Sequence, residues 1–354
     1  MNNLFVMHTQ YNLILSCGVI KKHFNDSYNV LILYAEFNLG SQLKEKLEEC
    51  FDKVYYVQDK YTYSANTFKE DLKLIKYMYK TKNLLNKTYD NVFISQENIY
   101  ETYLLSKLSK KCNFGCYAIE EDVYYSVNNA FNIDPPCKGQ TSFLGKCRKC
   151  FLDIWLGKNI CKQFVYFYGQ NTMYDANYVL FPHQVRKELS GRTLIEIEKD
   201  VIIAGTESLY GNQYDIIIDD SKIVLFFFDL VERYTNSEKI NKFVEMVSNI
   251  CQANDVVLAY KYHPRETNKF DFPQNRYFVE IPSIIPAEKI LYDLREKELT
   301  VMGNLTTSLW VAAKYGFNTY SFALLENSEN IAAVNALQGM GIKMINNLEE
   351  VDFL

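Results

Sequence analysis

Residues 256–266 read VVLAYKYHPRE, and this stretch decides the fold class that we expect for the chain. Its apolar, β-branched beginning predicts a buried strand, which ends at His263 because Pro264 follows. Proline biases the residue before it away from helix, so the imidazole is held in an extended corner. Ligands of open α/β sheets bind beyond the carboxyl ends of the strands, and Lys261 and Arg265 beside the histidine suit a phosphate. The stretch predicts an α/β fold with a candidate site at His263; a strand-ending turn without function is the alternative.

Apolar runs that predict strands alternate with segments of helical spacing along the whole chain. In the first half the predicted strands are 4–7, 29–34, 54–57, 91–94, 114–119 and 178–182, with helices from about 9 and at 42–50, 68–84 and 98–108. In the second half 201–205 opens a new run, and predicted strands 222–228, 277–280, 299–302 and 319–322 alternate with helices 238–251, 287–294, 306–315 and 327–340. Such alternation predicts parallel sheets with helices on both faces. We expect two Rossmann-type domains, 1–190 and 191–354, which face each other across a cleft and are connected through 183–200.

The composition is that of a globular protein, with 48% hydrophobic and 23% charged residues. A net charge of −5 argues against a nucleic-acid partner. The first residues lack the features of a signal peptide, and no segment approaches about 18 consecutive apolar residues, so we expect a cytoplasmic protein. Residues 145–164 mix basic and apolar side chains, which predicts either a helix lying on the cytoplasmic face of a membrane or an ordinary helix of the first domain.

The cysteines indicate reduced thiols rather than a disulfide framework, because their number, nine, is odd and the chain is long. Cys147 and Cys150 form a CxxC pair, but no second pair follows at the spacing of a zinc ribbon. We therefore expect no metal site.

Two groups of carboxylates stand at places where chemistry is common. Glu120, Glu121 and Asp122 end the strand 114–119, and adjacent carboxylates can raise each other's pKa, so one of them can serve as a general base. A solvated acidic turn is the alternative. Glu288 lies in the first turn of helix 287–294, after Pro286, where it can bind ribose hydroxyls or merely complement the helix dipole.

A further group is rich in hydroxyls and joins a predicted strand to a predicted helix. Gly303 follows the strand 299–302, and Thr306, Thr307 and Ser308 open the helix. Hydroxyls together with the backbone N–H groups of a helix N-terminus form an anion site. A plain helix N-cap is the alternative.

The order and spacing of these motifs resemble the bacterial sialyltransferases of glycosyltransferase family 52, which include lipooligosaccharide and capsular sialyltransferases. The resemblance covers most of the chain, with the stronger motifs in the second half. It implies that His263 and Pro264 are the family's His-Pro motif and that Thr307 and Ser308 are its Ser/Thr-Ser motif. Glu288 matches the glutamate that binds the cytidine ribose in similar enzymes.

The resemblance also implies where the catalytic base lies. The family's base belongs to an acid-acid-glycine motif, which falls on Glu120 and Glu121, with Asp122 where glycine is expected. Glu120 aligns with the first acid and is the preferred base. Asp229 and Glu232, which follow the strand 222–228, are rival bases.

Taken as a whole, the resemblance implies a GT-B-like inverting sialyltransferase that needs no cofactor and no metal. It would move sialic acid from CMP-N-acetylneuraminic acid to a galactose-terminated glycan of lipooligosaccharide or capsule. The donor-binding residues would include Lys261, Gly303 and Thr306 besides the motif residues. A homodimer is implied by resemblance as well.

Two alternatives stay open. The first is a capsule or wall transferase that uses another donor, such as CDP-glycerol, CDP-ribitol or a CMP-linked nonulosonic acid other than sialic acid. The second is a non-catalytic protein that binds a nucleotide sugar in capsule assembly, and Asp122 in place of the motif glycine gives this reading some support.

Overall fold

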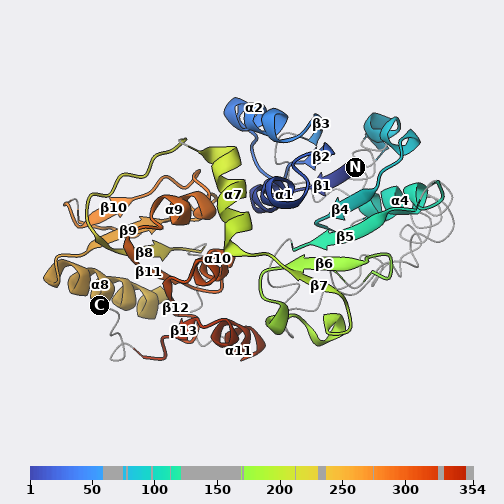
Figure 1. Cartoon of the computed structure of the whole chain (residues 1–354). Helices are drawn as coiled ribbons and strands as arrows, with labels where there is room; N and C mark the ends of the chain where they lie inside the picture. The colour runs from blue at the N-terminus through green and yellow to red at the C-terminus, as the bar shows by residue number, and fades with distance from the viewer. Residues whose placement is uncertain are drawn as a thin grey trace, which may run out of the picture. The chain divides into compact units, whose positions relative to one another are not determined.

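The computed structural model describes residues 1–58, 75–76, 79–96, 99–111, 113–120, 169, 171–211, 213–229, 237–273, 275–325 and 331–347. They form two compact units, which we call unit 1, ending at Leu209, and unit 2, beginning at Tyr210. In Figure 1 unit 1 runs from blue to yellow-green and unit 2 from yellow to red. Several predictions lie outside the described residues: most of the helix 68–84, the segment 145–164, the CxxC pair, Glu121, Asp122 and Glu232.

Unit 1 is built on a parallel sheet whose seven described strands run in the order β3-β2-β1-β4-β5-β6-β7. The strands are β1 (Asn2–Met7), β2 (Tyr28–Tyr34), β3 (Lys53–Gln58), β4 (Asn91–Ile94), β5 (Gly115–Ile119), β6 (Ala176–Val179) and β7 (Leu194–Glu196). The helices are α1 (Gln10–His23), α2 (Ser41–Cys50), α4 (Ile99–Leu108) and α7 (Lys199–Tyr210), with short 3-10 turns η1 (Leu84–Asn86), η3 (Pro182–Gln184) and η4 (Lys187–Leu189). The strand order reverses between β1 and β4, which is the topological switch point of this sheet.

The central strands of unit 1 are continuous apolar runs because side chains are buried on both faces of the sheet. On one face an aromatic row crosses neighbouring strands: Phe5 of β1 stacks on Phe93 of β4 with ring centroids 4.4 Å apart, and Phe93 stacks on Tyr117 of β5 at 5.0 Å. On the other face, buried aliphatic side chains of β1, β2 and β4 pack against α4. The aromatic and the aliphatic side chains together form the core of unit 1, and this core fixes the positions of the strand ends.

Helix α7 belongs to unit 1 because glycines let it cross α1 at very short distance. A Cβ on Gly18 of α1 would lie 1.9 Å from the carbonyl oxygen of Val201, and a Cβ on Gly205 would lie 1.8 Å from that of Ile14. The run 201–205, which we expected to open the second half, is therefore part of a helix of the first unit. Strand β7 also lies within the predicted connection 183–200, so unit 1 extends to Leu209, past the boundary expected at residue 190.

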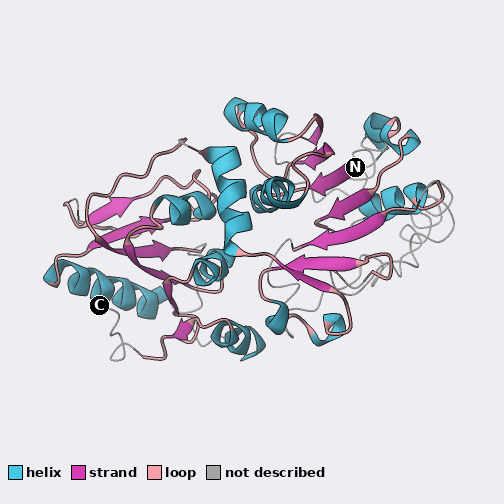
Figure 2. Cartoon of the chain, viewed as in Figure 1, coloured by secondary structure: helices cyan, strands magenta, loops and turns pink. Residues whose placement is uncertain are grey.

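Unit 2 repeats the parallel architecture with six described strands in the order β10-β9-β8-β11-β12-β13. The strands are β8 (Lys222–Phe227), β9 (Val257–Lys261), β10 (Phe278–Glu280), β11 (Glu298–Gly303), β12 (Asn318–Ser321) and β13 (Lys343–Met344). The helices are α8 (Ser237–Ala253), α9 (Ala287–Asp293), α10 (Thr307–Tyr315) and α11 (Ile331–Gly339), and Figure 2 shows them around the magenta sheet. This sheet reverses its order between β8 and β11. The two sheets together confirm the predicted fold class of two Rossmann-type units.

The core of unit 2 is notably aromatic. Phe226 of β8 stacks on Phe228 at 4.4 Å and on Phe322 at 5.2 Å, and Phe243 of α8 packs against the same group. Helix α8 contributes its apolar stripe to this cluster, which holds β8 and β9 in place. Among the described helices of both units, none has the length and apolar character needed to cross a membrane.

Candidate functional site

The carboxyl edge of the unit 2 sheet brings several predicted residues to one line. Strand register pairs Lys261 of β9 with Phe227 of β8, and Phe227 with Gly303 of β11. Neighbouring strands lie about 4.8 Å apart, so Lys261 and Gly303 flank β8 at its end. Two residues beyond this line the chain reaches His263 after β9 and Asp229 after β8. These four predicted residues therefore belong to one edge of the sheet, next to its switch point.

A local turn fixes the ring of His263. The backbone N–H of Arg265 donates to Nδ1 of His263 at 3.2 Å, and the N–H of Glu266 donates to the histidine carbonyl at 2.9 Å. Because Nδ1 accepts a hydrogen bond, the neutral ring carries its proton on Nε2. Nε2 is then the hydrogen-bond donor of the imidazole.

Lys261 and Glu288 form a buried pair of opposite charges at this edge. Both residues are less than a tenth exposed, at 8% and 7%. Burial lowers the pKa of Lys261 to about 8, although the charge of Glu288 opposes the shift. Burial also raises the pKa of Glu288, against the effect of its own backbone N–H and of Lys261. Buried ionisable groups that perturb each other in this way are typical of functional sites.

Helix α10 begins after the carboxyl end of β11 and packs against α9, which carries Glu288. Thr306 is the N-cap: its Oγ1 accepts a hydrogen bond from the backbone N–H of Ser308 at 3.4 Å. A Cβ on Gly303 would lie 3.0 Å from Cγ2 of Thr306 and 3.3 Å from Cδ2 of Leu309. Glycine at the end of β11 is thus what lets the helix begin close to the sheet, with its positive dipole end at the carboxyl edge.

Glu120, the preferred base, lies at the carboxyl edge of the unit 1 sheet. It directly follows β5 and is 7% exposed. Its Oε2 accepts the backbone N–H of Leu180 at 2.6 Å, which ties the end of β5 to the end of β6. Its carbonyl oxygen accepts a hydrogen bond from Nδ2 of Asn12 on α1 at 3.4 Å. The residue therefore has a structural role in the sheet, whatever its role in catalysis.

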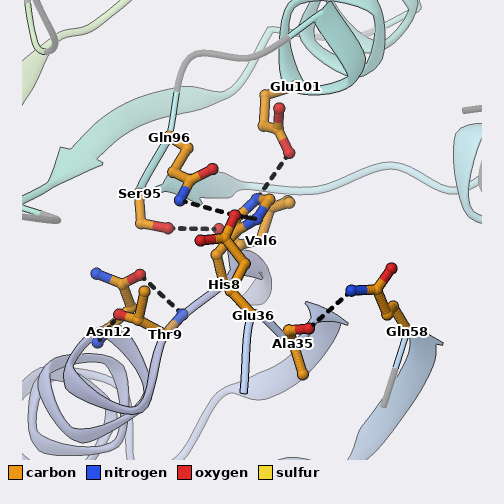
Figure 3. A network of polar contacts seen from close by, with 10 residues as sticks. All are labelled: Val6, His8, Thr9, Asn12, Ala35, Glu36, Gln58, Ser95, Gln96 and Glu101. Carbon is orange, nitrogen blue, oxygen red and sulfur yellow. Dashed lines mark hydrogen bonds and ion pairs between the residues drawn. The ribbon is translucent and has the colours of Figure 1, made fainter. Parts of the chain in front are cut away.

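A second polar cluster, which the sequence analysis missed, lies at the switch point of unit 1. His8 follows β1 and is 3% exposed. Its Nε2 donates to Oε1 of Glu101 on α4 at 2.9 Å, and its Nδ1 lies 3.5 Å from Oε1 of Glu36, which follows β2. Nε2 of Gln96, after β4, donates to the same Glu36 oxygen at 3.3 Å. Figure 3 shows the imidazole between the two carboxylates.

The two carboxylates decide the charge of the buried histidine. Burial alone would lower the pKa of His8, but the charges and hydrogen bonds of Glu101 and Glu36 outweigh it and raise the pKa to about 10. His8 is therefore an imidazolium at neutral pH. The sequence offered one signal for this cluster: His8 directly follows the first predicted strand, just as His263 follows a predicted strand in the second half of the chain.

Neither edge shows a metal centre. Within the residues that the structure describes, no group of three or more histidine, cysteine, aspartate or glutamate side chains is arranged to hold a metal ion.

The sequence matches no family model and no curated protein. Solved structures do match the whole fold. A glycotransferase of kitacinnamycin superposes with a TM-score of 0.55 at 10% identity, over 99% of this chain and 87% of that one. The fold is of the GT-B type. A UDP-GlcNAc 2-epimerase from Methanocaldococcus jannaschii matches with a TM-score of 0.53 at 11% identity, over 96% and 92% of the two chains. At such identities the likeness concerns the fold alone, and the resemblance to family 52 rests on the motifs.

Proposed function

We propose that this chain is an inverting glycosyltransferase that uses a CMP-linked donor, with sialic acid as the sugar transferred. The observation that carries the proposal is the carboxyl edge of unit 2, where Lys261, His263, Glu288 and the start of α10 surround the switch point. Nucleotides bind at such switch points, and phosphates at helix N-termini. The fold that the chain shares with a glycotransferase supports the same class of reaction.

Each group at this edge has a role in binding the donor. The buried carboxylate of Glu288 accepts hydrogen bonds from the ribose hydroxyls of cytidine. Nε2–H of His263 and the hydroxyls of Thr307 and Ser308 donate to the phosphate oxygens, together with the N-terminal dipole of α10. Lys261 adds a positive charge close to the same oxygens. Pro264 keeps the histidine in its corner.

The transfer step follows from these roles. A carboxylate, Glu120 in the first instance, takes the proton of the acceptor hydroxyl as its oxygen attacks the anomeric carbon. The bond from that carbon to the CMP phosphate breaks on the opposite face, so the configuration inverts and CMP leaves with the bonding electrons. The negative charge grows on the phosphate, where His263 and the hydroxyls donate. Asp229, at the edge of unit 2, is the rival base.

The test is transfer from CMP-N-acetylneuraminic acid to lactose and N-acetyllactosamine, read by product mass, with His263→Ala as the variant. Loss of one donor that stabilises developing charge lowers kcat by about a hundred- to a thousandfold. His183→Ala is the matched control, because His183 is exposed and follows a strand of unit 1. Equal activity of the His263 variant and wild type would contradict the role of this histidine.

The same assay separates the alternatives when the donor is varied. CDP-glycerol, CDP-ribitol and another CMP-nonulosonic acid test the other capsule and wall transferases. UDP-GlcNAc belongs in the panel because a UDP-GlcNAc 2-epimerase shares the fold. CMP binding by calorimetry, without turnover of any donor, would favour a non-catalytic nucleotide-sugar-binding protein.

A further inference from the structure

The two carboxylate oxygens of Glu36 in unit 1 have different surroundings. Oε1 accepts the hydrogen bond of Gln96 and faces Nδ1 of His8. Oε2 has no hydrogen-bond or ion-pair partner among the described residues. The side chain is 39% exposed, whereas His8 behind it is buried. One oxygen is therefore held by residues of unit 1, and the other has no partner among the described residues of a side chain that is 39% exposed.

The cluster keeps Glu36 ionised and carries a net negative charge. Burial alone would raise the pKa of Glu36, but its contacts with His8 and Gln96 outweigh burial and lower the pKa. His8 contributes one positive charge, and Glu36 and Glu101 contribute two negative ones, so the formal sum is −1. Such a site disfavours phosphates and other anions. It suits neutral hydroxyl groups, which donate to a carboxylate.

Two buried atoms add to this polarity. Oε2 of Glu101 is buried and makes no hydrogen bond with the described residues, whereas Nδ1 of His8 is buried and faces Oε1 of Glu36 at 3.5 Å. Buried polar atoms in folded proteins usually have a partner, either in the protein or in bound water or ligand. Both atoms belong to the cluster at the switch point of the sheet, which is where ligands bind in such folds.

The position of Glu36 in the fold indicates the same class of ligand. In Rossmann units an acidic residue after the second strand binds ribose hydroxyls, while a glycine-rich turn after the first strand approaches the phosphates. Glu36 stands after β2, but the turn after β1 reads His8-Thr9-Gln10 and contains no glycine. Thr9 also caps α1 by accepting the N–H of Asn12. Unit 1 thus has an acidic residue after its second strand, as diol sites do, and no glycine in the turn after its first strand.

We propose that Glu36 binds vicinal hydroxyls of a neutral sugar, with His8 and Gln96 as positioning residues. The identification of that sugar as the terminal galactose of the acceptor rests on the proposed function; the binding of a sugar diol to unit 1 does not. This assigns to unit 1 a ligand site that is separate from the donor groups of unit 2.

The test measures binding of methyl β-galactoside and its 3-deoxy and 4-deoxy analogues to the full chain, by calorimetry or ligand-observed NMR. Glu36→Gln keeps the size of the side chain and removes the charge. We expect binding of the parent galactoside to weaken about tenfold, as for loss of a charge-assisted hydrogen bond. The analogue that lacks the contacted hydroxyl should bind wild type and variant equally, a pattern that a general structural defect does not produce. Glu45→Gln, an exposed glutamate on α2 of the same unit, is the control and should change nothing.

Three outcomes would overturn the proposal: no binding of the galactoside to wild type, unchanged binding to Glu36→Gln, or an equal loss for all three sugars. Circular dichroism and urea unfolding of the same variant show whether the protein is folded. If Glu36→Gln does not fold, Glu36→Asp retracts the carboxylate by one methylene and should produce the same selective loss. Failure of sialyl transfer with galactoside binding intact would reject the proposed function and leave this inference standing.

Discussion

At the residue scale, each sheet has a buried basic side chain next to a carboxylate at its carboxyl edge. The pKa of this basic side chain is lowered in one sheet and raised in the other. Lys261 has one nearby carboxylate and is dominated by burial, so its pKa falls to about 8. His8 has two carboxylates within 3.5 Å, and these raise its pKa to about 10. The number and distance of the carboxylates decide which effect prevails. Lys261 therefore titrates near neutral pH, while the His8 cluster keeps its charge.

The titration of Lys261 predicts how nucleotide binding depends on pH. Protonated Lys261 attracts the phosphate, so CMP affinity should be highest below pH 8 and fall as the pH rises through 8, by at most about tenfold per pH unit. In Lys261→Met the affinity should be lower and this fall should disappear, because no charge remains to be lost. Calorimetric titration of CMP between pH 6.5 and 9.5 measures both. An identical pH profile in wild type and variant would exclude Lys261 as the titrating group.

At the scale of elements, glycines fix where two helices lie. Gly303 lets α10 begin against the end of β11, and the pair Gly18 and Gly205 lets α1 and α7 cross with backbone in contact. At Gly18 and Gly205 a Cβ would meet a backbone carbonyl oxygen at under 2 Å, whereas at Gly303 it would make a tight contact of 3.0 Å with the side chain of Thr306. The helix start that we assign to the phosphate and the helix that completes unit 1 both depend on the absence of a Cβ.

Gly205→Ala should therefore destabilise unit 1 strongly. Its Cβ would lie 1.8 Å from the carbonyl oxygen of Ile14, a backbone atom that cannot rotate away. We expect a loss of about 3 kcal/mol or more in the free energy of unfolding, at the upper end for overpacked sites. Urea unfolding followed by circular dichroism measures it. Gly191→Ala is the control, since a Cβ there meets nothing within 4 Å, and it should stay within about 0.5 kcal/mol of wild type.

Continuous apolar runs explain which elements could be predicted from the sequence. Buried parallel strands such as β1, β2 and β8 are continuous apolar runs, so periodicity and composition were sufficient to predict them. The run 201–205 is also short and apolar, and such a run suits a buried helix as well as a strand. Only its contact with Gly18, far away in the sequence, makes it a helix of unit 1. Strands β7 and β13, with three and two residues, were not predicted.

The candidate site divides in the same way. The positions of His263, Lys261 and Gly303 at strand ends could be predicted because each stands at the end of an apolar run, and their role in donor binding stays a prediction. The cluster around His8 was not, because Glu36 and Glu101 come from different elements and meet the histidine only through the strand order. Sequence patterns locate the ends of strands, whereas the order of strands in a sheet decides which ends become neighbours.

At the scale of the whole molecule, the two units repeat one topology and differ in the charge at their switch points. Unit 2 offers a cation, a helix N-terminus and hydroxyls, which suit a phosphate. In unit 1 the described residues offer a cluster with a net negative charge and a turn after β1 that contains no glycine. Together with the proposed function, this difference assigns the anionic donor to one unit and the neutral acceptor to the other.

This division predicts two separate footprints in amide hydrogen exchange. CMP should protect peptides that contain the end of β9 and the start of α10, and methyl β-galactoside should protect peptides that contain the ends of β1, β2 and β4. Each ligand at a hundredfold excess over its Kd should stabilise the native state by about 2.7 kcal/mol, and protection should appear where the amides border the ligand. Glu36→Gln should weaken the galactoside footprint at the same ligand concentration, to about 1.4 kcal/mol for a tenfold loss of affinity, while the CMP footprint persists. Lys261→Met should weaken the CMP footprint alone. Protection by both ligands of the same peptides in one unit would show that donor and acceptor share a site, and would refute the assignment of one ligand to each unit.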